Sequence, residues 1–375
     1  MKTTTDFDSG GGAIKDFEDG HVEIEMTDPK GYEYLGYFHF KLESGDGETV
    51  SFEVTNRDET ANRMPRDYRL YYTTELHGSE WRRFNDGIQS GFEHTFDDDE
   101  VYVASWQAYP YERTVQFVNQ LADAYPELVD TEVIGKSYEG RDIHALRITD
   151  PAVDTGETRD IVCTTRQHPG ETHGSYHLEG IAQEIINVIE QSSREFDDDY
   201  TFHLLPNLNP DGIYHGYHYD DAQGNNQNRE WDTSGPQEID HVREYLQDVV
   251  SDLHWGFDLH STTTSTFDVV PHWESGLTDE QHEKIRRIEA ASQSLSGRSG
   301  ADSDHIARGW MHQELDGDGT AVTTEAWTYH GYSVDDLHRE GREWIRIVTG
   351  LPGPKRLLAS DGRLLLADGQ LVVQS

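Results

Sequence analysis

Cysteine, signal-like segments and long apolar runs are all scarce in this chain of 375 residues. Cys163 is the single cysteine, so no internal disulfide can form, and its apolar neighbours Ile161 and Val162 predict a small buried side chain. No apolar run reaches the 18 residues of a membrane-spanning helix, and the first residues lack the apolar core of a signal peptide. These absences predict a cytoplasmic protein with no membrane partner.

Positive charge is also scarce. The chain has 30 Lys and Arg, only 7 of them Lys, against 72 Asp and Glu, which gives a net charge of −42. Such a negative field excludes nucleic acids as partners, because they need basic surfaces. With 8 Trp, 19 Tyr and 13 Phe, the chain is too aromatic for a disordered acidic protein. Acid-rich, Lys-poor composition resembles that of halophile proteins, for which a high-salt cytoplasm would screen surface charges over about 3 Å at 1 M.

Hydrophobic periodicity divides the chain into parts. Residues 1–18 are polar and glycine-rich and are predicted to be a flexible lead-in. Residues 19–108 show repeated period-two alternation, as at Val22, Ile24 and Met26, which predicts an antiparallel β-sandwich.

Helical spacing begins after the sandwich. Residues 109–350 alternate apolar strands with amphipathic helices, which predicts an α/β domain whose mixed sheet is covered on both faces. Residues 351–375 hold two short apolar runs separated by glycine turns and are predicted to form a hairpin tail.

One histidine cluster lies where ligand sites form in such a sheet. His168 and Glu171 follow a predicted buried strand that ends at Thr165 and precede a predicted helix. His260 follows a second apolar strand, so a set of two His and one Glu can meet, which is an established zinc site. A His and a Glu three apart also occur by chance, so the spacing alone leaves both interpretations open.

Several segments, in order, make the chain similar to the zinc metallocarboxypeptidases, most closely to the cytosolic carboxypeptidase subgroup and its bacterial relatives. These segments are Gly135–Ile143, Arg166–Thr172, Asn207–Gly212, Asn228–Trp231, Asp258–His260 and Thr323–Glu325, and Trp106–Tyr111 resembles the extra N-terminal domain of the subgroup. The resemblance covers about residues 20–350. It implies a mixed, eight-stranded-type sheet flanked by helices after the antiparallel β-sandwich.

The resemblance also implies a mechanism. One zinc ion per chain would be held by His168, Glu171 and His260, and Glu325 would be the general base that activates a water molecule. Asn228 and Arg229 would bind the free carboxylate of a peptide or protein C-terminus, which is the expected substrate. The oligomeric state is not predicted.

The side-chain pocket and the oxyanion site are less determined. Arg308 falls where relatives place the wall of the specificity pocket, and it would favour an acidic C-terminal residue; the alternative is a solvated Arg paired with Asp302 or Asp304. The family's oxyanion Arg is replaced by Tyr219, with His218 beside it, and either could donate instead. Losing one such donor can cost roughly 10²–10³ in rate.

Asn226 is a second departure, because many relatives carry an Asp that orients the first zinc His at this place.

Two alternatives to a peptidase stay open. One is an amidohydrolase of small N-acyl amino acids on the same scaffold, which the N-terminal sandwich disfavours. The other is a zinc-containing binding module with weak catalysis, which the replacement by Tyr219 suggests.

Overall fold

The structure is a computed structural model. It describes residues 2–18, 20–27, 36–43, 47–58, 64–88, 91–153, 156, 158–191, 196–263, 268–271, 276–292, 305–351, 366–367 and 370–371.

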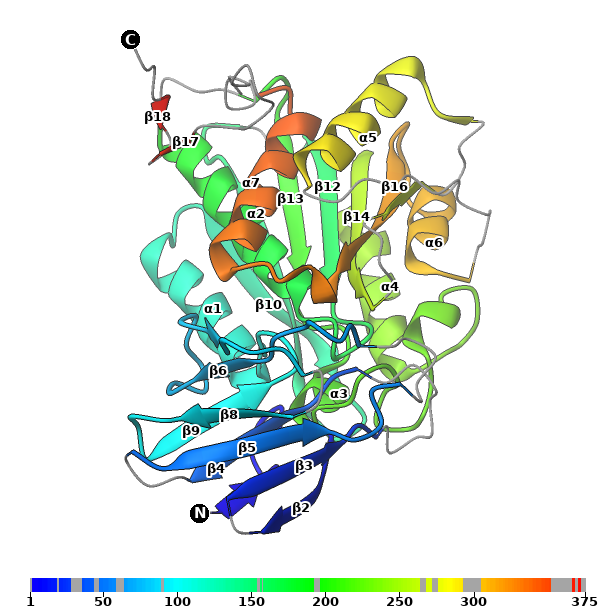
Figure 1. The fold of residues 1–375 in the computed structure, drawn as a ribbon. Helices are drawn as coiled ribbons and strands as arrows, with labels where there is room; N and C mark the ends of the chain where they lie inside the picture. The colour runs from blue at the N-terminus through cyan, green and yellow to red at the C-terminus, as the bar shows by residue number, and fades with distance from the viewer. Residues whose placement is uncertain are drawn as a thin grey trace.

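Two facing sheets form the N-terminal domain (Figure 1). One has the order β1-β4-β9-β6-β7 and the other β2-β3-β5-β8. The strands are β1 (Lys2–Thr4), β2 (Ala13–Glu18), β3 (His21–Glu25), β4 (His39–Glu43), β5 (Thr49–Val54), β6 (Tyr71–Thr73), β7 (Arg82–Arg83), β8 (Phe92–Thr95) and β9 (Glu100–Ala104). Alternate side chains of both sheets, such as Val22 and Leu42, share one buried core. The predicted sandwich is confirmed, although β3 and β5 pair in parallel.

The predicted flexible lead-in is wrong for residues 2–18, which contain two paired strands. β1 pairs with β4 and β2 with β3. The Asp8 carboxylate accepts a hydrogen bond from the Tyr111 amide at 3.0 Å and so caps the next helix. Gly11 lies so close to Gly216 that a Cβ there would be 2.1 Å from the Gly216 carbonyl oxygen. This segment is held by backbone and carboxylate contacts, which its polar composition does not reveal.

The second domain is built on a seven-stranded mixed sheet with the order β10-β11-β13-β12-β14-β16-β15. The strands are β10 (Val129–Lys136), β11 (Asp142–Thr149), β12 (Arg159–Thr165), β13 (Tyr200–Leu205), β14 (Leu253–Thr262), β15 (Asp268–Pro271) and β16 (Thr320–Trp327). The four central strands β13, β12, β14 and β16 are parallel to one another. The strands outside them, β10 and β11 on one side and β15 on the other, pair in antiparallel fashion. The α/β class is confirmed, with seven strands rather than eight in the described residues.

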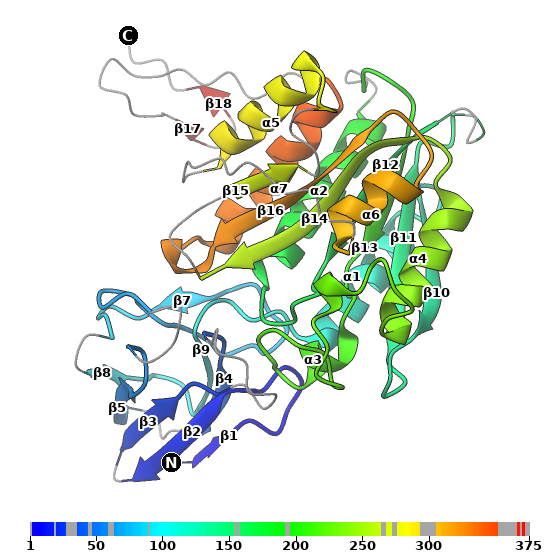
Figure 2. The same cartoon turned by 90° about the vertical axis from the view of Figure 1, so that its right-hand side faces the viewer.

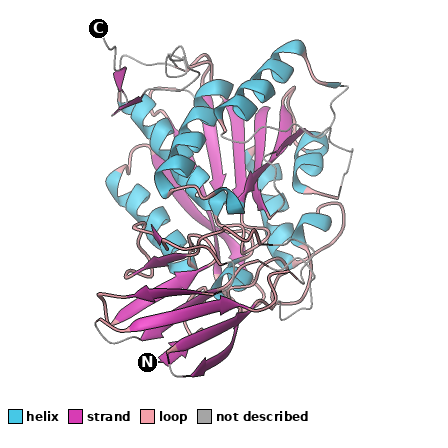
Figure 3. Ribbon diagram, viewed as in Figure 1, coloured by secondary structure: helices cyan, strands magenta, loops and turns pink. Residues whose placement is uncertain are grey.

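Helices cover both faces of this sheet (Figures 2 and 3). They are α1 (Tyr111–Ala124), α2 (His173–Glu190), α3 (Pro210–Tyr214), α4 (Gln237–Val249), α5 (Asp279–Ala291), α6 (Ala307–Glu314) and α7 (Val334–Val348), with short 3₁₀ turns η1 (Gln227–Arg229) and η3 (Thr328–His330). α1, α2, α5 and α7 pack on one face around Cys163, Phe257 and Val322, and Cys163 is buried as predicted. α4 and α6 pack on the other face around Val162 and Ala321.

The carboxyl ends of β12, β14 and β16 point towards the N-terminal domain (Figure 1). Polar side chains that follow these strands therefore lie where the two domains meet. In the tail, β17 (Leu366–Ala367) pairs with β18 (Gln370–Leu371) in antiparallel fashion. Among the described residues, no helix has the length and apolar character needed to cross a membrane.

Candidate metal centre

A tight turn between β12 and α2 carries His168 and Glu171. The turn begins at Arg166, whose φ of +67° is unusual for a residue with a side chain. The Arg166 guanidinium is buried and donates from Nε to the Pro169 carbonyl at 2.9 Å, so it closes the turn on itself. The Glu171 amide donates to the His168 carbonyl at 3.2 Å, which directs both side chains to the same side.

His260 reaches the same place from β14. β14 lies beside β12 in parallel register, with Thr165 opposite Leu259, so both strands end at one edge of the sheet. One ligand atom from each of His168, Glu171 and His260 lies within 4.8 Å of the other two, and all three residues are buried. The structure therefore brings together the three ligands that the sequence predicted.

Both imidazoles turn the same nitrogen towards the carboxylate. The Nδ1 atoms of His168 and His260 lie 2.9 and 2.7 Å from the two oxygens of Glu171. Although burial alone would raise it, the facing imidazoles hold the pKa of the Glu171 carboxyl well below its usual range. Burial would lower the pKa of His260, but the carboxylates of Asp258 and Glu171 hold it well above its usual value.

The outer nitrogens have their own partners. His168 Nε2 lies 3.1 Å from Asn226 Oδ1, and His260 Nε2 lies 3.0 Å from Asp258 Oδ2. Such contacts fix the orientation and tautomer of metal-binding histidines and leave the inner nitrogens for the ion. Two Nδ1 atoms and one carboxylate form a His₂Glu donor set, so these residues fit a zinc ion.

Sequence reasoning quoted Asp258 and Gln167 only as parts of motifs and missed their contacts. Asp258 is fully buried, and Gln167 donates from Nε2 to its Oδ1 at 2.5 Å. Gln167 is fixed in turn, because its Oε1 accepts a hydrogen bond from Trp231 Nε1 at 2.6 Å. Asp258 could have been found from strand periodicity, since a residue two before His260 shares its face of the sheet.

Glu325 lies on β16 directly beside His260. The two residues are partners in the parallel β14–β16 register, so their side chains leave the sheet on the same face. Glu325 is half-buried there. A carboxylate in this place lies next to the ligand set on the side covered by α6.

Asn228 and Arg229 lie on η1 at the edge of the centre. Asn228 is buried, with Nδ2 3.3 Å from His260 Nε2 and with Oδ1 accepting from the Ala307 amide at 3.2 Å. Arg229 is exposed and donates from Nη1 to the Asn228 carbonyl at 2.7 Å. The pair thus combines an amide in contact with His260 with a guanidinium open to the solvent.

Tyr219 and His218 lie beside His168, the first of the three predicted ligands in the chain. The Tyr219 ring stacks on His168 with a centroid distance of 3.8 Å and an angle of 19°. Burial lowers the pKa of His218 to about 4, and its Nδ1 accepts a hydrogen bond from the Tyr37 amide at 3.0 Å. The neutral ring therefore carries its proton on Nε2.

Arg308 lies on α6, which covers the face that carries Glu325. Its Nη1 donates to Thr323 Oγ1 at 3.1 Å. Burial lowers the pKa of Arg308, while the charges of Asp258 and Glu325 raise it and that of Arg229 lowers it again, so these groups share one electrostatic environment. Asp302 and Asp304, the alternative partners, lie outside the described residues.

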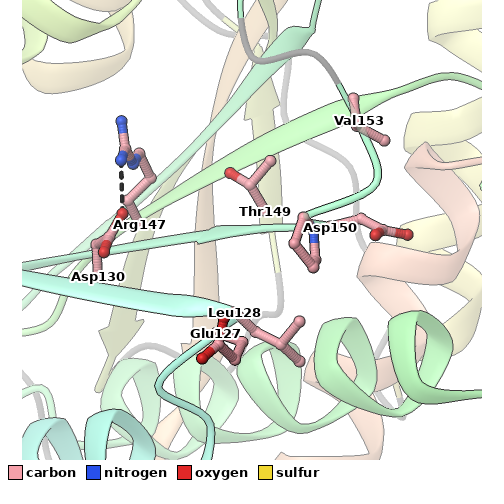
Figure 4. Close-up of a pocket in the computed structure, with 8 residues that line it drawn as sticks. Glu127, Leu128, Asp130, Arg147, Thr149, Asp150 and Val153 are labelled. Atoms are coloured by element: carbon pink, nitrogen blue, oxygen red, sulfur yellow. Dashed lines mark hydrogen bonds and ion pairs between the residues drawn. The ribbon is translucent and has the colours of Figure 1, made fainter.

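A pocket of about 180 Å³ lies at the opposite end of the sheet (Figure 4). It is bounded by the start of β10 and the end of β11, where Arg147 and Asp130 form an ion pair at 2.5 Å. Thr149, which also lines it, is paired with Thr201 near the start of β13. This pocket is therefore remote from the predicted ligands.

Comparison with known families gives two matches. A model described as zinc carboxypeptidase matches residues 114–297, and one described as cytosolic carboxypeptidase N-terminal domain matches residues 3–117. The two matched ranges follow one another along the chain and share residues 114–117.

Individual proteins give the same picture. An uncharacterized protein of Zymomonas mobilis is 25% identical over 280 residues, which are 71% of this chain and 70% of that one. Mouse cytosolic carboxypeptidase 6 is 26% identical over 277 residues, 67% of this chain, and the match spans only 50% of the mouse protein. The crystal structure of a metallo-carboxypeptidase from Burkholderia cenocepacia has a TM-score of 0.76 at 21% identity and covers 92% of this chain and 97% of its own, which shows the shared fold.

Proposed function

The chain belongs to the zinc metallocarboxypeptidases of the cytosolic carboxypeptidase type, and we propose that it removes single residues from the C-termini of peptides or protein tails. One observation carries the proposal. The buried set of His168, Glu171 and His260 has a glutamate, Glu325, beside it in strand register.

His168 and His260 would bind the same zinc ion, each through its Nδ1 atom, together with the Glu171 carboxylate. When bound, zinc lowers the pKa of a coordinated water molecule and polarises the scissile carbonyl. Asn226 and Asp258 would keep the two imidazoles in place, since each accepts a hydrogen bond from an outer nitrogen. Asn226 supplies a neutral oxygen where many relatives are expected to have a carboxylate.

Glu325 would act as the general base. It would take a proton from the attacking water and pass it to the nitrogen of the leaving residue. Its position beside His260 supports this role, because a proton carrier must lie within hydrogen-bond reach of the water.

Asn228 and Arg229 would select a chain end. A guanidinium binds a planar carboxylate through two parallel hydrogen bonds. Arg229 is exposed, and its neighbour Asn228 contacts His260. An internal peptide bond has no carboxylate at this distance, so the pair favours an exopeptidase.

Arg308 would bind the side chain of the departing residue, with a preference for Asp or Glu. Its electrostatic proximity to Arg229 and Glu325 supports a place beside the same bound substrate. Tyr219 or His218 would supply the hydrogen bond to the developing oxyanion. The Nε2–H of His218 is the donor that its contact with the Tyr37 amide leaves available.

The proposal is tested by incubating the chain with peptides that differ in their last residue. Assays are run in dilute buffer and in concentrated KCl, because the net charge of −42 is expected to repel acidic peptides unless salt screens it. Release of single C-terminal amino acids should disappear with a chelator and should fall about 10²–10⁴-fold in Glu325→Gln.

Glu184→Gln is the matched control, since Glu184 is a buried glutamate on α2 that pairs with Arg346 at 2.6 Å. It should keep full activity. Zinc bound at one ion per chain with no release from any peptide would replace the peptidase by a binding module with weak catalysis.

A further inference from the structure

The segment that joins the two domains runs along the zinc-ligand turn. Each of four consecutive residues in this segment makes a hydrogen bond with the turn or with the helix that follows it. The bonds are Trp106 Nε1 to the Gly170 carbonyl at 2.9 Å, Thr172 Oγ1 to the Gln107 carbonyl at 2.6 Å, Tyr176 Oη to the Ala108 carbonyl at 2.8 Å and Arg166 Nη1 to the Tyr109 carbonyl at 2.9 Å. We call residues 106–109 the brace.

Gly170 is the point where the brace reaches the ligands, because it lies between His168 and Glu171. Its carbonyl accepts from Trp106, and its amide donates to the His218 carbonyl at 2.9 Å. Trp106 has no exposed surface, so water does not compete for the hydrogen bond between its N–H and the Gly170 carbonyl. Both backbone groups of Gly170 are thus held from outside the turn.

Close packing leaves the turn no room to shift. A Cβ on Gly170 would lie 2.9 Å from His218 Cα and 3.0 Å from Tyr37 Cβ. Tyr37 belongs to the N-terminal domain and also binds His218 Nδ1 through its amide at 3.0 Å. The N-terminal domain therefore contacts the ligand turn directly through Trp106 and also through the loop that carries His218.

We propose that Trp106 is a positioning residue for the metal centre, and that the N-terminal domain serves the reaction by holding the ligand turn in its metal-binding shape. The turn starts at the left-handed Arg166, a conformation that persists only when surrounding contacts determine it. Metal ligands must also be held to within about 0.5 Å. The inference rests on the zinc site proposed above, but it concerns residues that touch neither metal nor substrate.

Trp106→Phe in the full chain is the test, since it removes the N–H and keeps most of the aromatic bulk. Zinc affinity, measured by chelator competition, should fall about 10–100-fold, as for other outer partners of metal ligands. The absorption spectrum of the cobalt-substituted protein should also change, because it reports ligand geometry. With saturating zinc, kcat should fall while KM stays the same.

Trp344→Phe is the matched control, because Trp344 is equally buried but packs on His177 of α2. It should keep zinc affinity and the cobalt spectrum. If Trp106→Phe does not fold, Thr172→Val removes a hydrogen bond to the brace from the other side and should give the same changes.

Two outcomes would overturn the inference in different ways. A wild-type chain that binds no zinc would remove the proposed function and the inference with it. A wild-type chain that binds zinc, with Trp106→Phe equal in affinity and spectrum and altered only in its melting temperature, would leave the peptidase intact and reduce the brace to a structural contact.

Discussion

Replacing Asp258 by asparagine is expected to weaken zinc binding although Asp258 is not a ligand. Four hydrogen-bond donors converge on its two oxygens. Oδ2 lies 3.0 Å from His260 Nε2 and 3.4 Å from Thr323 Oγ1, and Oδ1 lies 2.5 Å from Gln167 Nε2 and 3.2 Å from Thr164 Oγ1. Asparagine offers one oxygen and one NH₂ group, so one side of this arrangement must place donor against donor.

The threonine hydroxyls can rotate and accept, but His260 Nε2–H and the Gln167 amide are on opposite oxygens and compete for the single remaining acceptor. If His260 loses the acceptor, its ring is no longer held in orientation. If Gln167 loses it, the contact of donor against donor removes the hydrogen bond that fixes the side chain on which His260 depends. Loss of such a partner typically weakens metal binding by about 10–100-fold. At a fixed free zinc concentration well above the dissociation constant, the stabilisation by zinc should therefore fall by about 1.4–2.7 kcal/mol.

The assay is a chelator competition for zinc affinity together with thermal unfolding with and without zinc. Asp160→Asn is the control, because Asp160 is a buried carboxylate 2.9 Å from His203 Nε2, at the opposite end of β12. Asp160→Asn should lower stability with zinc affinity unchanged. Equal zinc affinities in wild type and Asp258→Asn would refute the role given to Asp258.

Two further predictions concern specificity and pH. Arg308→Met should reduce the preference for Glu over Leu at the peptide C-terminus by about 10–100-fold in the ratio of kcat/KM values, since one charged hydrogen bond is lost; an unchanged ratio would leave Arg308 a structural residue. Burial raises the pKa of the Asp160 carboxyl, but hydrogen bonds from His203 and from two backbone amides more than offset this and hold it below its usual value. The stability contributed by Asp160 should therefore be complete above its unfolded pKa of about 3.9 and vanish as the pH falls through the folded value. Urea unfolding of wild type and Asp160→Asn between pH 6 and 2 should converge at the acid end, and a constant difference would contradict the assignment.

Period and position were enough to predict the fold class and to place His168, Glu171 and His260 at one edge of the sheet, whereas the resemblance to the metallocarboxypeptidases supplied their proposed role as zinc ligands. The alternation at Val22 and Ile24 follows directly from burial, because every second side chain of a sandwich strand enters the core. His168 and His260 could be found because parallel strands end at a common edge.

Contacts between distant segments of the chain could not be predicted in this way. Asp8 and Gly11 are bound through a helix end and a close backbone approach, and neither leaves a periodic signal. The brace is similar, because it makes three of its four contacts through its own backbone carbonyls, which every sequence has. Trp106 is the exception, since a tryptophan in a predicted domain junction needs a partner for its N–H.

Arg308, the proposed specificity residue, and His260, a proposed zinc ligand, are joined by a short chain of hydrogen bonds. Arg308 donates to the Thr323 hydroxyl, that hydroxyl donates to Asp258, and Asp258 accepts from His260. Loss of Arg308 can therefore change zinc binding as well as substrate binding, and a fall in kcat/KM on one peptide would not tell the two apart. The ratio between two peptides does, because a change at the metal affects both substrates equally and cancels. A variant that lowers both rates together with zinc affinity acts through Asp258, and one that changes only the ratio acts on the substrate.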